Sequence, residues 1–173
     1  VMKTANPSIA NNTIQHAGVI LGIGGVAGHA HKYFHKNSFG YQSRLLLTQD
    51  FSAVTAACLA ISAKNWKLLG GLDQENLHVN YNDVDLCLKA LRFGLRNIYL
   101  PHVILTHFES KSRGRPKGKF YTQWEKESKF FKKKWKNFLE NDPSYSPHNT
   151  LIEENFLISI RNKNSIKIRD GYD

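Results

Sequence analysis

The sequence is poor in cysteine and in long apolar runs, and both shortages narrow its class. Its two cysteines, Cys58 and Cys87, lie in separate apolar stretches and form no Cys-x-x-Cys pair. We therefore expect neither a disulfide scaffold nor a zinc ribbon, and a reducing compartment fits best. No run reaches the roughly 18 apolar residues that a membrane span requires, and the first residues lack the apolar stretch of a secretion signal.

The composition is that of a folded chain with an uneven charge. Its 173 residues are 41% hydrophobic and 22% charged, which fits one domain, or one domain with a helical tail. The formal net charge is +10, and 11 of the 24 Lys and Arg residues lie between 111 and 136. The remainder of the chain is nearly neutral and reads as an α/β core. The basic balance indicates anionic partners without choosing among them.

Hydrophobic periodicity predicts alternating strands and helices. Continuous apolar or β-branched runs predict strands over 13–21, 51–63 and 96–105, the second buried on both faces and the third interrupted by Pro101. Glycine and histidine between 22 and 40 indicate a long irregular loop. Helical spacing and end signals predict helices over 64–69, 83–93 and 120–139, the last long and amphipathic.

A glycine motif after the first expected strand resembles a dinucleotide fingerprint. It reads Gly22-x-Gly24-x-x-Ala27. The fingerprint requires a helix to begin there, with its amide groups facing a pyrophosphate, and an acidic residue about 20 positions later. Neither feature follows, so we expect these glycines to shape a loop.

Three histidines in the same loop are candidate metal ligands. His29 and His31 are spaced by two, which places their imidazoles on one side of an extended chain, and His35 follows. No cysteine or carboxylate lies within the run to complete a ligand shell. A structural zinc site and a polar loop that contacts a ligand or another domain both remain open.

Asp83-Val84-Asp85 has the form of a metal-binding Asp-x-Asp. Two such carboxylates converge on a cation when the chain is extended or sharply turned. On a helix, positions two apart point about 200° away from each other, so the helical pattern that follows argues against a shared ion. One carboxylate can face a cleft while the other caps the helix, and both can merely cap it.

The basic segment contains aromatic residues at helical spacing. Phe120, Trp124, Phe131 and Trp135 fall on one face, which predicts a core-facing stripe with lysines on the solvated side. No helix-turn-helix, zinc finger or ribonucleoprotein motif accompanies them, so we do not expect a nucleic-acid partner. A peripheral contact with an anionic membrane is compatible with this pattern.

Four motifs, in order and at characteristic spacing, carry a specific resemblance. They read NTIQHAGVILGIGGVAGHAH, FSAVTAACLAISAKNWKLLGGLDQE, NDVDLCLKALRFGLRNIYLP and THFESKSRG. This succession closely resembles bacterial glycosyltransferases of family two, and more narrowly the rhamnosyltransferase and O-antigen type, whose members read GTIQHAGVVLG, NDVDFCLR and YHHESASRG. The later DPSYSPHNT is similar to that group's DPYYNPNLS. The resemblance covers about residues 6–150.

The resemblance implies an α/β chain that forms the C-terminal part of a GT-A fold. That fold is a mixed sheet with flanking helices, here followed by a C-terminal amphipathic helix. The matching residues belong to its second half, so we expect residues 1–118 to be the acceptor-binding half, without the donor-binding half. Residues 119–173 would form a helical extension and tail.

The resemblance also implies roles for individual residues. Asp83 is similar to the general base that removes the proton from the acceptor hydroxyl, although Asn82 stands where many relatives have Glu. Asp73 and Asp85 are the expected acceptor-binding or acceptor-positioning carboxylates. His107 looks like a histidine that completes the divalent-metal shell in some relatives. Two further cations are expected to contact the diphosphate of the donor: Lys111 and Arg113.

The function implied is inverting transfer of a sugar during the synthesis of cell-surface polysaccharide. The donor would be a nucleotide sugar, UDP- or dTDP-linked, and the acceptor a saccharide or lipid-linked saccharide. The intact enzyme would use Mg²⁺ or Mn²⁺, which this portion alone need not bind. We expect the protein in the cytoplasm or at the inner face of the membrane. The alternative is a non-catalytic saccharide-binding or scaffold remnant of the same fold.

Overall fold

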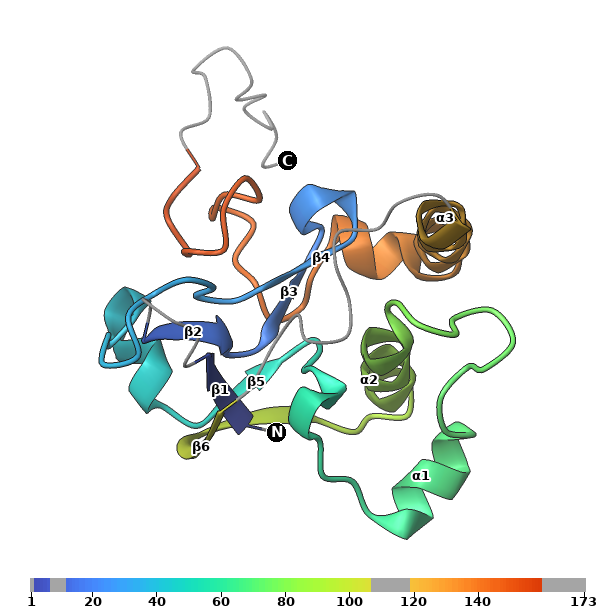
Figure 1. Cartoon of the computed structure of the whole chain (residues 1–173), viewed down its shortest axis with the longest axis horizontal. Coiled ribbons are helices and arrows are strands. Elements are labelled where there is room, and N and C mark those ends of the chain that lie inside the picture. The colour runs from blue at the N-terminus through green and yellow to red at the C-terminus, as the bar shows by residue number, and fades with distance from the viewer. Residues whose placement is uncertain (1, 7–11, 107–118, 160–173) are drawn as a thin grey trace, which may run out of the picture.

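The computed structural model of the chain describes residues 2–6, 12–106 and 119–159 and has a mixed α/β architecture (Figure 1). Its larger sheet has the strand order β2-β1-β6-β5. β1 and β6 run parallel, whereas the β1–β2 and β5–β6 pairs are antiparallel. The expected α/β class with a mixed sheet is confirmed. The four strands are β1 (Met2–Asn6), β2 (Thr13–His16), β5 (Gln49–Phe51) and β6 (Asn97–Thr106).

The prediction of a single strand over 13–21 is wrong. The chain turns within this stretch and contributes one strand to each of two sheets. β2 ends at His16, and β3 (Val19–Leu21) pairs antiparallel with β4 (Ala27–His29) in a second sheet. Gly18 between them has φ of 105°, and a Cβ atom there would lie 2.5 Å from the ring of Phe51. Only glycine tolerates both the positive φ and this close approach. The expected irregular loop also contains β4 and two 3-10 turns, η1 (Ile23–Gly25) and η2 (Tyr41–Leu46).

The strand expected over 51–63 is also shorter than its apolar run. The regular strand β5 ends at Phe51, and the chain remains buried through Thr55. The Thr55 hydroxyl then accepts a hydrogen bond from the Ala57 amide at 3.2 Å and caps the 3-10 turn η3 (Ala56–Cys58). This local side-chain acceptor offers the backbone an alternative to strand pairing. Burial on both faces therefore applies only to the first part of the run.

Pro101 does not interrupt the last strand, contrary to expectation. β6 runs through it over ten residues. The register of its pairing with β1 shifts between Leu100 and Ile104. Pro101 lies within this irregular part, where the regular hydrogen-bond pattern between the strands is interrupted and a backbone N–H is not required.

The three predicted helices are confirmed. They are α1 (Ala63–Leu69), α2 (Asn82–Arg92) and α3 (Lys119–Glu140). Ser62 caps α1 by accepting from the Asn65 amide at 3.2 Å, and Gly70 ends it in the left-handed conformation. Gly94, with φ of 71°, follows the end of α2 as expected.

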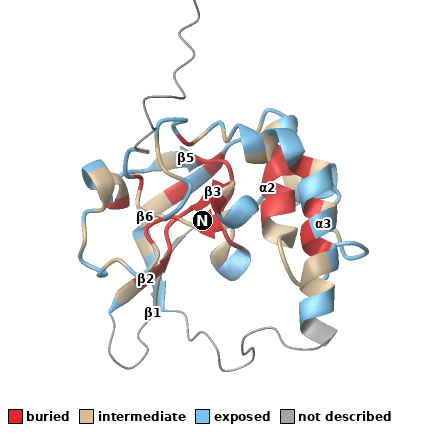
Figure 2. Ribbon diagram, turned by 90° about the horizontal axis from the view of Figure 1, so that it is seen from above, coloured by how far each residue is buried: buried red, intermediate tan, exposed pale blue. Residues whose placement is uncertain are grey.

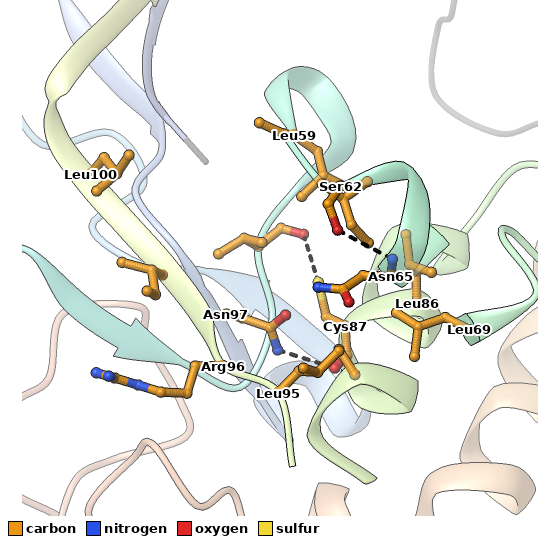
Figure 3. Close-up of a pocket in the computed structure, with 15 residues that line it drawn as sticks. Leu59, Ser62, Asn65, Leu69, Leu86, Cys87, Leu95, Arg96, Asn97 and Leu100 are labelled. Atoms are coloured by element: carbon orange, nitrogen blue, oxygen red, sulfur yellow. Dashed lines mark hydrogen bonds between the residues drawn. The ribbon is translucent and has the colours of Figure 1, made fainter. Parts of the chain in front are cut away.

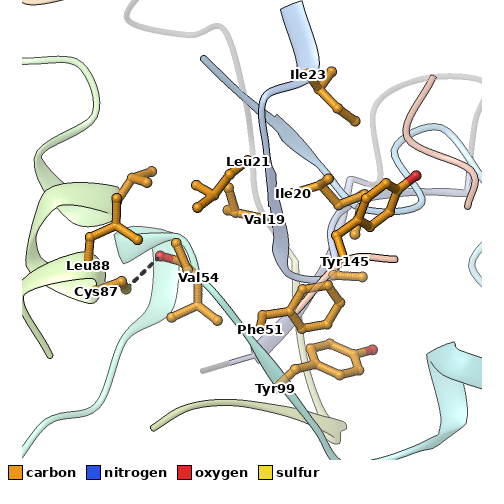
Figure 4. Packing of buried hydrophobic residues seen from close by; sticks show 14 of the residues in the cluster. Val19, Ile20, Leu21, Ile23, Phe51, Val54, Cys87, Leu88, Tyr99 and Tyr145 are labelled. Atoms are coloured by element: carbon orange, nitrogen blue, oxygen red, sulfur yellow. Dashed lines mark hydrogen bonds between the residues drawn. The ribbon is translucent and has the colours of Figure 1, made fainter. Parts of the chain in front are cut away.

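The main core joins β3, β5, β6, α2 and α3 (Figures 2 and 4). Phe51 and Tyr99 pack edge to face beneath β3, with ring centroids 6.1 Å apart. Phe131 and Trp135 of α3 are 0% and 1% exposed, which confirms that this part of the aromatic stripe faces the core, whereas the side chain of Phe120 lies outside the described part of the chain. Trp124 is half-buried. The core therefore contains side chains from both sides of residue 118, where we placed the boundary between the two portions.

Asp142 fastens the segment after α3 to the sheets. Its carboxylate accepts hydrogen bonds from the Leu21 amide at 2.8 Å, the Ser144 amide at 2.8 Å and the Ser52 hydroxyl. Burial raises the pKa of Asp142 above its ordinary value, although these three donors oppose the shift. One carboxylate thus connects β3, the continuation of β5 and the C-terminal segment.

Candidate functional site

Asp83 lies in the first turn of α2 and faces the η3 turn. Its Oδ2 accepts from the Ala56 amide at 2.9 Å, and its Oδ1 accepts from the Val84 amide at 2.8 Å. The two amides fix the orientation of a carboxylate that is only half-buried. Each oxygen retains a further lone pair, so the group can still accept a proton or a hydrogen bond from a ligand.

Asp85 faces the opposite way and is completely buried. Its Oδ1 accepts from the Trp135 indole N–H at 2.8 Å and lies 2.7 Å from Lys134 Nζ, and its Oδ2 lies 3.2 Å from Lys89 Nζ. The two carboxylates of the Asp-x-Asp therefore diverge, as expected for a helix. Asp85 connects α2 to α3.

Asp73 and Asp85 lie close together, on either side of the same lysine. Lys134 Nζ is 3.6 Å from Asp73 Oδ2 and 2.7 Å from Asp85 Oδ1. Asp73 also accepts from the Asn76 amide at 3.0 Å. Burial alone raises the pKa of Asp73, but the hydrogen bonds from Asn76 and the charge of Lys134 bring it below its ordinary value. The two predicted acceptor carboxylates thus form one cluster, whereas Asp83 stands apart from it.

Glu127 of α3 holds the turn that leads into α2. Its Oε2 accepts from the amide and the side chain of Asn80, both at 2.7 Å, and its Oε1 accepts from the Val79 amide at 3.3 Å and from Gln123 at 2.9 Å. Burial raises the pKa of Glu127, but these donors together lower it below the ordinary value. Tyr81 follows in a left-handed conformation, with φ of 63°, and the helix begins at the next residue.

Sequence reasoning missed both Glu127 and Lys134, but a signal was present. Glu127 lies three residues after Trp124 and four before Phe131, within the aromatic face of the helix. A carboxylate at helical spacing inside an apolar stripe must be buried, and a buried carboxylate requires several donors. The role of Lys134 had no comparable signal, because it is the third of three consecutive lysines.

The predicted diphosphate and metal residues cannot be placed. His107, Lys111 and Arg113 lie outside the described residues, and β6 ends at Thr106. Their roles stay predictions.

The histidines of the glycine-rich segment do not converge on a common point. His29 Nδ1 lies 2.8 Å from Nδ1 of His16, whereas His31 stacks on Phe156 with ring centroids 4.8 Å apart. His35 is exposed, and its Nδ1 accepts from the Asn37 amide at 3.2 Å. Within the described ranges, no three His, Cys, Asp or Glu side chains could hold one metal ion. The zinc hypothesis for this loop therefore receives no support.

An apolar cavity of about 330 Å³ lies between α1, α2 and β6 (Figure 3). Its lining includes Leu59, Leu86 and Cys87 but no carboxylate. Burial raises the pKa of the Cys87 thiol to about 12, so this thiol is not a nucleophile at neutral pH. The cavity therefore offers apolar surface bordered by polar groups such as Arg96 and Asn97, without a carboxylate or an ionised thiol.

A polar cavity of about 570 Å³ opens between the 75–78 segment and α3. Asn76, His78, Gln123 and Lys126 contribute hydrogen-bonding groups, and Phe130 contributes a ring. This combination of planar polar groups with one aromatic face suits a hydroxyl-rich ligand.

Two curated bacterial proteins are similar to this chain. It is 42% identical over 149 residues to uncharacterized protein y4gI of Sinorhizobium fredii. The aligned residues cover 84% of this chain and 16% of that protein. It is 32% identical over 146 residues to O-antigen biosynthesis protein RfbC of Myxococcus xanthus. The aligned residues cover 80% of this chain and 11% of that protein. The chain thus spans about a sixth and a ninth of these relatives.

Two further comparisons found nothing. No family model and no solved structure matches the chain. The structure and the curated relatives together show a mixed α/β protein that is distantly related to a protein named for O-antigen biosynthesis.

Proposed function

We propose that this chain is the acceptor-side portion of an inverting glycosyltransferase of family two with a GT-A fold, which acts in the synthesis of cell-surface polysaccharide. The observation that carries the proposal is the oriented, half-buried carboxylate of Asp83 at the start of α2. The motif resemblance and the similarity to O-antigen biosynthesis protein RfbC support it. The activity belongs to the complete protein that contains this portion.

In the proposed reaction, Asp83 takes the proton of an acceptor hydroxyl as its oxygen attacks the anomeric carbon of the donor sugar. The new C–O bond forms opposite the departing diphosphate, which leaves with the electron pair of the broken bond, so the anomeric configuration inverts. A carboxylate suits this task because the hydroxyl becomes acidic only as its bond to the sugar forms. The amides of Ala56 and Val84 keep Asp83 in place throughout.

The acceptor is a saccharide or lipid-linked saccharide. Its reacting hydroxyl lies at Asp83, and we place a more distant sugar unit of it near Asp73. Asp73 is partly accessible and borders the segment that lines the polar cavity with Asn76 and His78. Asp85 acts indirectly, because it is buried and holds Lys134 between itself and Asp73. In this arrangement Asp73 contacts sugar hydroxyls, and Asp85 positions Asp73 through Lys134.

The donor is a UDP- or dTDP-sugar, whose diphosphate would contact Lys111 and Arg113. A divalent ion, Mg²⁺ or Mn²⁺, would neutralise the charge of that diphosphate, with His107 as one ligand. The described residues supply no converging set of ligands, so we derive no step through a metal ion. The reaction would take place at the cytoplasmic face of the membrane, where the donor is available.

The test is Asp83→Asn in the intact gene product. Asparagine keeps the shape and the Oδ1 acceptor but cannot take a proton, so the rate of sugar transfer should fall by about 10²-fold or more. Asp50→Asn, which alters an exposed carboxylate paired with Arg96, is the matched control and should retain activity. Near-normal turnover by Asp83→Asn would refute the assignment and move the base elsewhere.

A second assay separates catalysis from binding. The purified 173-residue chain, given nucleotide sugars and acceptor, should show no turnover above a protein-free control. Turnover would contradict the expectation that a donor-binding half is required. Saccharide binding by an intact protein that never transfers sugar would instead favour the non-catalytic alternative.

A further inference from the structure

α3 turns a row of lysines away from the core. Phe131 and Trp135 are buried against the sheets, whereas the lysines on the opposite face are exposed (Figure 2). Helical spacing brings these lysines onto one surface, because residues three and four apart are neighbours. We call this surface the lysine face; its members are Lys126, Lys129, Lys132, Lys133 and Lys136.

The lysine face keeps most of its charge. Lys129 pairs with Glu125 at 3.1 Å, and Lys136 pairs with Glu140 at 3.8 Å. Among the described residues, no carboxylate lies within ion-pair distance of the other three members of the face. Both existing pairs are exposed, so water screens them and they compete weakly with an external anion.

Lys134 shows that this charge is sorted by position rather than spread at random. It belongs to the same run of lysines but points inward, 2.7 Å from Asp85. The cation that contacts the core is thus half-buried and paired with Asp85, whereas the lysines of the lysine face are exposed.

The neighbouring surface allows close approach. Lys132 Nζ lies 3.4 Å from the position that a Cβ atom on Gly25 would occupy. Gly24 and Gly25, which carry no side chain, are exposed in the η1 turn, and Ile23 of the same turn is buried. A flat anionic surface could therefore contact the lysines without obstruction from this turn.

We propose that the lysine face docks the protein on an anionic membrane surface by contacting lipid phosphate groups. Flexible lysine stems suit a fluid array of phosphates, and the attraction adds up over several cations. A single-stranded nucleic acid would also require exposed rings among the lysines for base stacking, and there Phe131 and Trp135 are buried and Phe130 is half-buried. Within the described ranges no helix is long and apolar enough to cross a bilayer, so attachment by this face is peripheral. The proposal does not depend on the catalytic one.

The experiment is co-sedimentation of the 173-residue chain with vesicles. The chain should bind vesicles of phosphatidylcholine mixed with phosphatidylglycerol and dissociate from them at high salt. It should not bind vesicles of phosphatidylcholine alone. The double variant Lys132→Gln/Lys133→Gln should bind about 30-fold more weakly, because each cation near the surface contributes about fivefold. The matched control is Lys64→Gln/Lys67→Gln, which removes the same charge from exposed positions on α1.

The control and a competition assay decide between the outcomes. Weak binding by the α3 variant with near-parental binding by the α1 variant supports the proposal. Equal losses in the two variants would overturn it, because net charge and not the lysine face would then explain binding. Binding to neutral vesicles, or displacement from anionic vesicles by equimolar RNA or DNA, would overturn it as well. Thermal melts of all three proteins establish that each is folded.

Discussion

The two sides of the first turn of α2 place equal charges in opposite environments. On the α3 side, Asp85 is buried and its oxygens contact Trp135, Lys134 and Lys89. On the η3 side, Asp83 is half-buried and accepts hydrogen bonds from two backbone amides, those of Ala56 and Val84. A carboxylate surrounded by cations holds elements together, whereas one oriented by amides and open to solvent is available for chemistry. Two residues of sequence thus separate a structural role from a proposed catalytic one.

The largest expected effect is the loss of the α3-side carboxylate. Asp85→Ala removes the partner of Lys134 and Lys89 and leaves the Trp135 indole N–H without its acceptor. We expect the free energy of unfolding to fall by about 3–5 kcal/mol, the cost of breaking a buried ion pair. Urea denaturation would measure it, with Asp50→Ala as the control, since that pair with Arg96 is exposed. A loss below about 1 kcal/mol would remove the distinction between the two sides.

A similar loss should follow from Trp135→Ala on the same side. Trp135 is 1% exposed, and emptying a buried aromatic site costs about 3–5 kcal/mol. The matched control is Trp66→Ala on α1, where the ring is 40% exposed and its removal should cost far less. If Trp135→Ala melts like the parent protein, the aromatic stripe is a binding face and our core assignment is wrong.

A smaller effect should follow from neutralising Glu127. Glu127→Gln replaces charge-assisted hydrogen bonds to Asn80 and Val79, which are worth about 1.5–3 kcal/mol. The pKa of Glu127 is lowered in the folded state, so its contribution is present above the unfolded value of about 4.3 and is lost as pH falls through the folded pKa. The difference in stability between parent and variant should therefore shrink below about pH 4. A pH-independent difference would mean that the charge is not responsible.

The smallest expected effect on stability is that of Asp83→Asn. Asparagine preserves the side-chain volume and the acceptor for one of the two amides but loses the hydrogen bond to the other, so the free energy of unfolding should fall by only about 1 kcal/mol. The comparison between the two sides predicts this small change in the same variant whose transfer activity should collapse. A large loss of stability would show that Asp83, like Asp85, mainly holds the fold.

The sequence predicted the helices better than the strands. Periodicity and capping residues such as Ser62 and Gly70 are local signals, and all three helices were found with nearly correct ends. Strand limits depend on contacts between distant residues. The turn at Gly18 reflects the ring of Phe51 in another strand, and continuity through Pro101 depends on a register shift against β1. Neither contact leaves a mark in its own stretch of sequence.

For the site, helical geometry alone predicted that Asp83 and Asp85 diverge. It could not predict which of them would be buried, because burial depends on where α3 packs. The cluster of Asp73, Lys134 and Asp85 joins three elements, and Lys134 is one of several consecutive lysines. Its inward direction follows from its position on the helix relative to Trp135, which becomes informative only once the packing of α3 is known.

The carboxylate of Asp142 bears on how the chain folds as it is synthesised. It bonds to Leu21, 121 residues earlier, and to Ser52, 90 residues earlier. Because translation proceeds from the N-terminus, the amide of Leu21 and the hydroxyl of Ser52 leave the ribosome long before their acceptor does. Such long-range closure is slow, and the Leu21 amide and the Ser52 hydroxyl lack this acceptor until residue 142 is free to bind. Nascent chains that end before this residue should therefore resist protease poorly, and chains that extend well past it should become resistant together.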